Sequence, residues 1–220
     1  MNAAAIEIET GPNPRASVIW LHGLGADGND FAPIARQLHL PLPTRFVFPH
    51  APMQPVTING GSVMRAWYDI SDRNMARRED EAGIRKSQGM IDQLIEHEIE
   101  RGISPGKIVL AGFSQGGAIA LQAGLRSTQR LAGILALSTY LPLGQTLATE
   151  RNRENHGLPI FMAHGTYDNV IPLSIATDSC GILQEHCYAV EWHEYPMPHS
   201  VNNEEIADID AWLGRVLKGG

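Results

Sequence analysis

A serine at position 114 stands between glycines in a pattern that is typical of serine nucleophiles. Residues 110–119 read LAGFSQGGAI, so Gly112, Ser114 and Gly116 form G-x-S-x-G. An apolar run that predicts a strand enters this motif and a run with helical spacing leaves it, which places the serine at a sharp strand-to-helix turn. Glycines permit the crowded backbone of such a turn. The alternative is a serine that caps the helix, with glycines present for close packing.

A serine hydroxyl attacks efficiently when a histidine takes its proton and a carboxylate orients that histidine. In a sheet of this kind the acid and then the histidine follow the serine, each just past the end of a strand. Asp168 in HGTYDNVIP follows the apolar run PIFMAHG, and His199 in MPHSVNN follows AVEWHEYP. The sequence therefore predicts a catalytic triad of Ser114, Asp168 and His199.

Other histidines and acids fit this arrangement less well. His193 lies inside a predicted strand, His186 lies at a helix end, and His164 precedes the acid. Asp178 lies within a predicted helix, where a solvated face is the simpler interpretation. We expect structural roles for all four.

Acyl transfer also needs amide donors for the oxyanion that forms on the substrate carbonyl. The residue after the nucleophile, Gln115, supplies one backbone N–H, and the loop after an early strand commonly supplies the second. The segment WLHGLGADGNDF is that loop. We expect Leu24, in its HGLG turn, to be the second donor.

The same loop contains a competing motif. GLGADG, residues 23–28, matches the dinucleotide fingerprint G-x-G-x-x-G. A dinucleotide site needs an Asp or Glu about 20 residues further on to hold the ribose, and residues 31–68 contain neither. We interpret the motif as a glycine-rich loop with an amide donor, and we expect no cofactor and no metal.

Short β-rich runs alternate with helical patterns along the chain. The predicted strands are residues 17–22, 45–49, 107–113, 132–138, 159–164 and 189–196, and the helical patterns include residues 31–38, 84–99 and 206–217. Such alternation predicts an α/β fold with a mostly parallel sheet and helices on both faces. Residues 50–78 and 139–157 do not fit, and loops of that length are usually functional.

Composition narrows the classes of protein that need consideration. With 220 residues, the chain fits a single domain over 1–220, and its net charge of −7 argues against nucleic acid as a partner. No apolar stretch is long enough for stable membrane insertion, and the acidic N-terminus does not resemble a signal peptide. Cys180 and Cys187 lie too far apart in a predicted helix to form a disulfide. We expect a cytoplasmic protein with free thiols.

Eight segments together resemble the acyl-protein thioesterase and carboxylesterase family, in particular its bacterial carboxylesterase branch. They are LHGLGADGNDF, RFVFPHAP, PVTINGG, AWYDI, LAGFSQGGAIAL, LAGILALSTYLP, HGTYD and YPMPHS, in order over residues 16–217. The resemblance implies an α/β-hydrolase fold without a large cap domain and hydrolysis of carboxylic esters, with acyl thioesters as further substrates, without a cofactor. It assigns the nucleophile, acid and base to Ser114, Asp168 and His199, and the oxyanion amides to Leu24 and Gln115.

The resemblance also implies a substrate groove lined by Trp67 and Tyr140, and the long segments add Leu141 to its wall. Ordinary packing of loop residues is the alternative. The expected substrate is a small ester or thioester with a short to medium acyl chain; lipid-like molecules and acylated proteins are further candidates. A serine acyltransferase or perhydrolase on the same fold and a catalytically silent binding module remain alternative functions. The sequence leaves open the oligomeric state, the preference between esters and thioesters, and any movement of residues 50–78.

Overall fold

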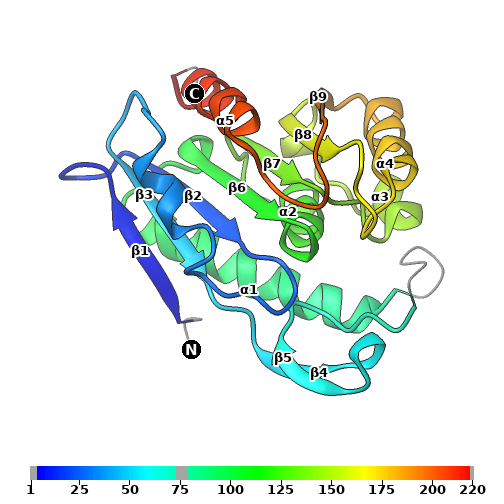
Figure 1. Cartoon of the computed structure of the whole chain (residues 1–220). Coiled ribbons are helices and arrows are strands. Elements are labelled where there is room, and N and C mark those ends of the chain that lie inside the picture. The colour runs from blue at the N-terminus through cyan, green and yellow to red at the C-terminus, as the bar shows by residue number, and fades with distance from the viewer. Residues whose placement is uncertain (1–3, 73–78, 219–220) are drawn as a thin grey trace.

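A seven-stranded sheet forms the centre of the computed structural model, which describes residues 4–72 and 79–218 (Figure 1). Its strands are β1 (Ala5–Glu9), β2 (Ala16–Leu21), β3 (Thr44–Pro49), β6 (Ile108–Phe113), β7 (Gly133–Leu137), β8 (Pro159–Gly165) and β9 (Ala189–Tyr195). They lie in the order β1-β3-β2-β6-β7-β8-β9, and all neighbours are parallel except β1, which is antiparallel to β3. This topology confirms the expected α/β-hydrolase fold. The extent of the domain, residues 1–220, stays a prediction.

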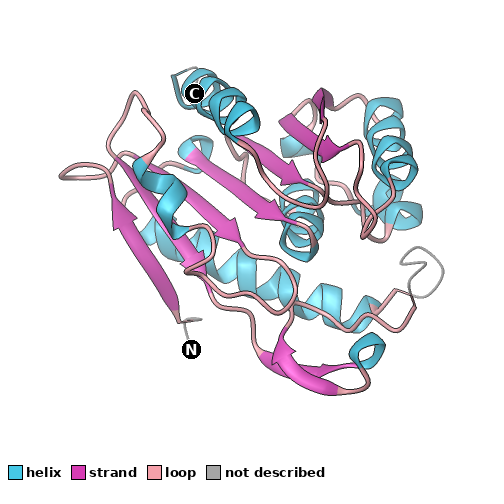
Figure 2. Ribbon diagram, in the orientation of Figure 1, coloured by secondary structure: helices cyan, strands magenta, loops and turns pink. Residues whose placement is uncertain are grey.

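Helices cover both faces of the sheet (Figure 2). They are α1 (Glu81–Glu100), α2 (Gln115–Arg126), α3 (Leu147–Glu150), α4 (Leu173–Glu185) and α5 (Asn203–Lys218). Apolar side chains of α1, α2 and α4 pack on one face, and those of α5 and of the 3-10 helix Ala32–Arg36 pack on the other. Because both faces are buried, strands such as β2 and β7 are buried along their whole length, and Ser17 is the one polar residue in these two strands.

The structure differs from the predicted secondary structure in the segment 31–38 and around Cys187. The helix expected over residues 31–38 is a short 3-10 helix with Pro33 near its start and no side-chain cap. Cys187 lies beyond the end of α4 with a φ of 64°, so the two cysteines do not share a helix. Both thiols are nevertheless free, as expected; Cys180 is buried and Cys187 is exposed.

The edge strand β1 is also absent from the predicted set, because it is only five residues long and half-exposed and so lacks a continuous apolar run. An ion-pair network attaches it to the rest of the molecule. Arg45 contacts Glu9 at 3.0 Å and Glu98 at 3.0 Å, while Arg101 contacts both Glu7 and Glu98 at 2.9 Å. The charges on this edge also discourage pairing with another strand.

The two long segments contain short elements of their own. Residues 50–78 include a separate hairpin of β4 (Met53–Val56) and β5 (Ser62–Arg65) and a 3-10 helix at Thr57–Asn59; residues 73–78 lie outside the described residues. Residues 139–157 include α3 and two 3-10 helices. In the described ranges no helix is long and apolar enough to cross a membrane. A cytoplasmic location stays a prediction.

Glu205, on the first turn of α5, carries a buried carboxyl group. Neither of its oxygens makes a hydrogen bond of ordinary geometry among the described residues, and burial raises the pKa of this group to about 8 although the nearby Asn202 N–H acts to lower it. The folded protein therefore keeps a proton that the unfolded chain releases above about pH 4.5. The free energy of unfolding should fall as the pH rises from about 4.5 to 8, by about 1.4 kcal/mol per pH unit from this group.

We predict that Glu205→Gln, which has no proton to lose, raises the free energy of unfolding at about pH 8.5 by more than about 1 kcal/mol and changes it little near pH 4.5. Urea unfolding at a series of pH values measures the difference. Glu204→Gln, at the exposed neighbouring position, is the control and should show no such pH dependence. An equal effect of Glu205→Gln at both pH values would contradict the prediction.

Candidate active site

Ser114 lies at the turn between β6 and α2 in a strained backbone conformation, with φ of 55° and ψ of −121°. Two hydrogen bonds hold this conformation: the Ser114 N–H donates to the Leu137 carbonyl at 2.8 Å, and the Thr139 hydroxyl donates to the Ser114 carbonyl at 2.7 Å. The side chain makes no capping hydrogen bond with the helix. The hydroxyl is therefore available for another contact.

The glycines of G-x-S-x-G allow the backbone to come this close. A Cβ atom at Gly112 would overlap the backbone of Gly116, and one at Gly116 would overlap the carbonyl groups of Leu21 and His22 at the end of β2. Helix α2 thus begins in direct contact with two strand ends. Any larger residue at either position would push the serine out of place.

The structure brings Ser114, His199 and Asp168 together, although 85 residues separate the first two. His199 Nε2 lies 2.9 Å from Ser114 Oγ, and His199 Nδ1 lies 2.6 Å from Asp168 Oδ2. The three residues follow β6, β8 and β9, whose carboxyl ends meet at one edge of the sheet. The Phe113 ring lies 4.7 Å from the His199 ring and supports it from the side.

The charge of Asp168 fixes the protonation of the histidine. Burial alone would raise the pKa of this carboxyl, but hydrogen bonds from His199 and from the Ile171 and Val170 amides outweigh it and hold the pKa below its usual value. An ionised carboxylate only accepts hydrogen bonds. Nδ1 of His199 therefore carries the proton, and Nε2 can accept the proton of the Ser114 hydroxyl.

Two residues whose backbone amides have no protein acceptor in the described part of the chain line the same cavity as Ser114. Leu24 and Gln115 both line it, and among the described residues neither backbone N–H has a protein acceptor. For Gln115 this is expected, because the first N–H groups of a helix have no partner within it. A substrate carbonyl oxygen in this cavity could accept from both.

His22 orients the peptide unit that ends in the Leu24 N–H. Its Nε2 accepts from the Ala51 N–H at 3.0 Å, so Nδ1 carries the proton and donates to the Gly23 carbonyl at 2.7 Å. Burial lowers the pKa of His22, which keeps the ring neutral. Because the Gly23 carbonyl and the Leu24 N–H belong to one peptide plane, the imidazole fixes the direction of the amide.

The glycines of GLGADG have local structural explanations. Gly25 adopts a φ of 77°, and a Cβ at Gly28 would overlap the Phe48 carbonyl. The Gly28 N–H donates to His50 Nδ1 at 3.0 Å. The spacing of these glycines thus serves a turn and close backbone packing.

A cavity of about 280 Å³ opens beside Ser114. Besides Ser114, its wall contains two tyrosines, the uncharged polar residues Asn59 and Gln115, and five aliphatic residues: Leu24, Ile58, Ile70, Val170 and Ile171. The hydroxyl groups of Tyr68 and Tyr140 lie 2.9 Å apart, and burial raises the pKa of both phenols. Both are therefore neutral, and the wall suits an apolar group.

Trp67 does not line this cavity, contrary to the expectation from the sequence. The side chain is buried behind it, where Nε1–H donates to the His22 carbonyl at 2.9 Å. The neighbouring Tyr68 takes the place in the wall. Both aromatic residues of AWYDI are apolar enough to be buried, so the sequence contains no signal that separates them.

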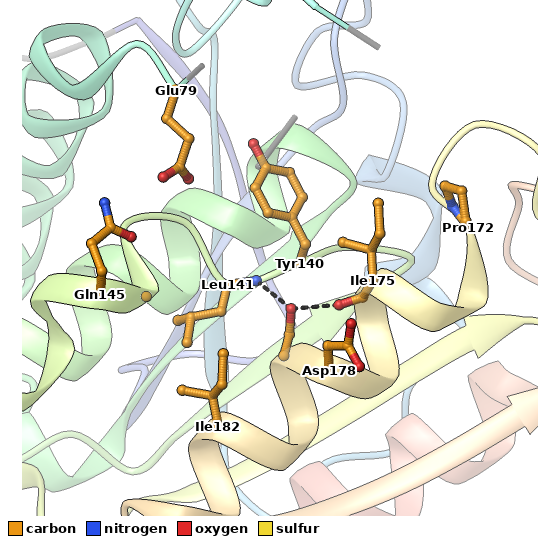
Figure 3. A pocket seen from close by; sticks show the side chains of 10 residues that line it. Glu79, Tyr140, Leu141, Gln145, Pro172, Ile175, Asp178 and Ile182 are labelled. Carbon is orange, nitrogen blue, oxygen red and sulfur yellow. Dashed lines mark hydrogen bonds between the residues drawn. The ribbon is translucent and has the colours of Figure 1, made fainter. Parts of the chain in front are cut away.

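Leu141 lies in the wall of a second cavity, of about 610 Å³, next to the first (Figure 3). Tyr140 lines both cavities, while Ile175 and Ile182 of α4 lie in the wall of the second. Of the three expected groove residues, Tyr140 alone contributes to the cavity beside Ser114.

The Gln115 side chain connects the nucleophile turn to the cavity wall. Its Oε1 accepts from the Trp67 N–H at 2.8 Å, and its Nε2 donates to the Tyr68 carbonyl at 2.8 Å. The side chain is buried. Gln115 thus fixes the backbone of the wall, while its own N–H has no protein acceptor among the described residues.

Comparison with known proteins identifies the relatives of the chain. Residues 1–217 match the family model described as Phospholipase/Carboxylesterase. Acyl-protein thioesterase 1 of Yarrowia lipolytica is 38% identical over 221 residues, which cover 97% of this chain and 97% of that protein. Acyl-protein thioesterase 1 of Neurospora crassa is 42% identical over 209 residues, which cover 90% and 85%.

Among solved structures, SOBER1 of Arabidopsis thaliana has a similar fold. The TM-score is 0.87 at 31% sequence identity, and the match covers 92% of this chain and 99% of that one. The chain therefore belongs to the phospholipase/carboxylesterase family of α/β-hydrolases and is a serine hydrolase of the carboxylic-ester and thioester class.

Proposed function

We propose that the chain hydrolyses carboxylic esters of short to medium acyl chains, and acyl thioesters, through an acyl-serine intermediate. The observation that carries this proposal is the hydrogen-bonded series from Ser114 through His199 to Asp168 at the mouth of an apolar cavity. Ser114 is the nucleophile, His199 the general base and Asp168 the acid that orients the base.

In the first step, Ser114 Oγ attacks the acyl carbonyl while His199 Nε2 takes the hydroxyl proton. The negative charge of Asp168 stabilises the imidazolium that forms. The amides of Leu24 and Gln115 donate to the oxyanion, and each donor of this kind is worth about 3 kcal/mol in the transition state. His199 then gives the proton to the departing alcohol or thiol.

In the second step, water attacks the acyl-serine. His199 takes a proton from the water, the same amides hold the second oxyanion, and collapse releases the carboxylic acid and returns the proton to Ser114. Each proton that His199 removes is passed on to the leaving group or to Ser114. No atom changes its oxidation state, so the reaction needs no redox partner.

The proposed substrate class follows from the cavity and from the relatives. An uncharged wall of aliphatic side chains and two neutral phenols favours an acyl chain over a charged group. The name acyl-protein thioesterase 1, carried by the fungal relatives, supports acylated proteins as substrates, and the carboxylesterase family supports small esters.

A rate survey of oxygen and sulfur esters, combined with fluorophosphonate labelling, tests the proposed function. We expect the label on Ser114 and acid release from both classes of substrate. Absence of labelling would favour a silent binding module. Preferred transfer of the acyl group to added alcohol or peroxide, with water competing poorly, would favour an acyltransferase or perhydrolase.

We predict that Ser114→Ala and His199→Ala each lower kcat by several orders of magnitude while the protein stays folded, because the two residues act as one unit. His193→Ala is the matched control, since this histidine lies within β9 and contacts Glu191 rather than the triad. Steady-state kinetics and circular dichroism measure the outcome. Retention of more than about a tenth of the rate in either triad variant would contradict the assignment, since positioned proton transfer contributes about 100-fold or more.

We predict that kcat/KM rises severalfold between acetyl and butyryl or hexanoyl p-nitrophenyl esters, because each buried methylene contributes up to about 0.8 kcal/mol. The rise should then level off, since the cavity beside Ser114 has a volume of only about 280 Å³. Rates for chains of two to sixteen carbons measure the profile. A flat profile, or one highest at acetyl, would refute the acyl-binding role.

We predict that Tyr140→Ala moves the optimum to longer chains, because removal of the ring joins the two cavities. Tyr140→Phe, which keeps the ring and loses the hydroxyl, is the control and should keep the wild-type optimum. Equal loss of rate at every chain length in Tyr140→Ala would show that the ring supports the site without limiting chain length.

A further inference from the structure

His164 is a fully buried histidine beside the proposed acid Asp168, and it approaches the same carboxylate oxygen as His199. It lies near the end of β8, and its Nε2 lies 2.8 Å from the Ile171 carbonyl oxygen and 3.3 Å from Asp168 Oδ2. Both neighbours are acceptors. Nε2 must therefore carry the proton, which leaves Nδ1 as the bare nitrogen of a neutral ring.

Two observations agree with this assignment. Burial lowers the pKa of His164, which favours the neutral ring. Nδ1 is buried and has no hydrogen-bond partner among the described residues. An apolar side chain at this position would avoid that unpaired nitrogen, so packing alone does not account for a histidine here.

The contacts of His164 complete the set of donors around the Asp168 carboxylate. Oδ1 accepts from the Val170 and Ile171 amides at 2.8 and 2.9 Å, and Oδ2 accepts from His199 at 2.6 Å with the His164 N–H close by. His164 thus binds the carbonyl of the same residue, Ile171, whose amide binds Oδ1. The imidazole anchors the turn of residues 168–171 to the strand that precedes it.

We propose that His164 is a positioning residue for the reaction: its Nε2–H fixes the 168–171 turn and thereby the direction in which Asp168 Oδ2 meets His199. This inference rests on the proposed function. Without the hydrogen bond from His164 to the Ile171 carbonyl, the turn would let the Asp168 carboxylate rotate away from the His199 ring. Misplacement by about 1 Å can lower a rate about 100-fold.

Two substitutions separate the hydrogen bond from the volume of the side chain. His164→Met keeps an unbranched side chain of similar length and removes the N–H, whereas His164→Gln keeps an amide N–H near the place of Nε2. We expect His164→Met to lower kcat about 10-fold or more with KM changed less than about threefold, and His164→Gln to recover activity to within about threefold of wild type. His193→Met, on the neighbouring strand β9, is the matched control and should stay within about twofold.

Two outcomes would overturn the proposal: wild-type kcat in His164→Met, or a folded His164→Gln as impaired as His164→Met. Because His164→Met can fail to fold, nitrogen NMR of the wild-type protein provides a second test. We expect the Nε2–H tautomer of a neutral His164 ring between about pH 6 and 8; an Nδ1–H tautomer or an imidazolium would also overturn the proposal. Failure of the proposed function has a different signature, namely a wild-type protein without esterase or thioesterase activity and without fluorophosphonate labelling.

Discussion

The close contact between α2 and the ends of β2 and β6 is the constraint on which the site depends. Gly112 and Gly116 let the backbones touch, and the connection between strand and helix must then turn within one residue, Ser114. The backbone of Ser114 is therefore strained, with a positive φ that non-glycine residues rarely adopt. The same geometry directs the hydroxyl away from the helix and leaves the first helical N–H, of Gln115, without a partner.

The hydrogen bonds around the site determine which of its side chains are charged. Asp168 is the ionised group of the triad, and the donors that surround it outweigh the effect of burial on its pKa. The histidines His22 and His164 are buried and neutral, and each uses one N–H to fix a peptide carbonyl. In the proposed mechanism, the ionised Asp168 carboxylate faces the ring on which positive charge develops.

Much of this arrangement could be predicted from the sequence, because parallel strands buried on both faces are continuous apolar runs. Once the strands are located, a serine, an acid and a histidine that each follow a parallel strand must lie at one edge of the sheet. The edge strand β1 escaped prediction because it is short and half-exposed. The roles of Tyr68 and Trp67 could not be separated from the sequence. The backbone of both residues is held by the Gln115 side chain, which lies 47 residues from Tyr68 and 48 residues from Trp67 in the chain.

The proposed role of His164 could not be predicted from the sequence either. In the sequence it is a histidine in the wrong order for a base, and its function emerges only from a turn that brings Ile171 back against the strand. Gln115 connects the proposed oxyanion site to the wall of the cavity beside Ser114. In the proposed reaction its backbone N–H donates to the oxyanion, while its side chain holds the backbone of Trp67 and of the cavity-wall residue Tyr68. A change in the wall is transmitted to the oxyanion donor through one residue, so acyl preference and rate should not vary independently when this region is altered.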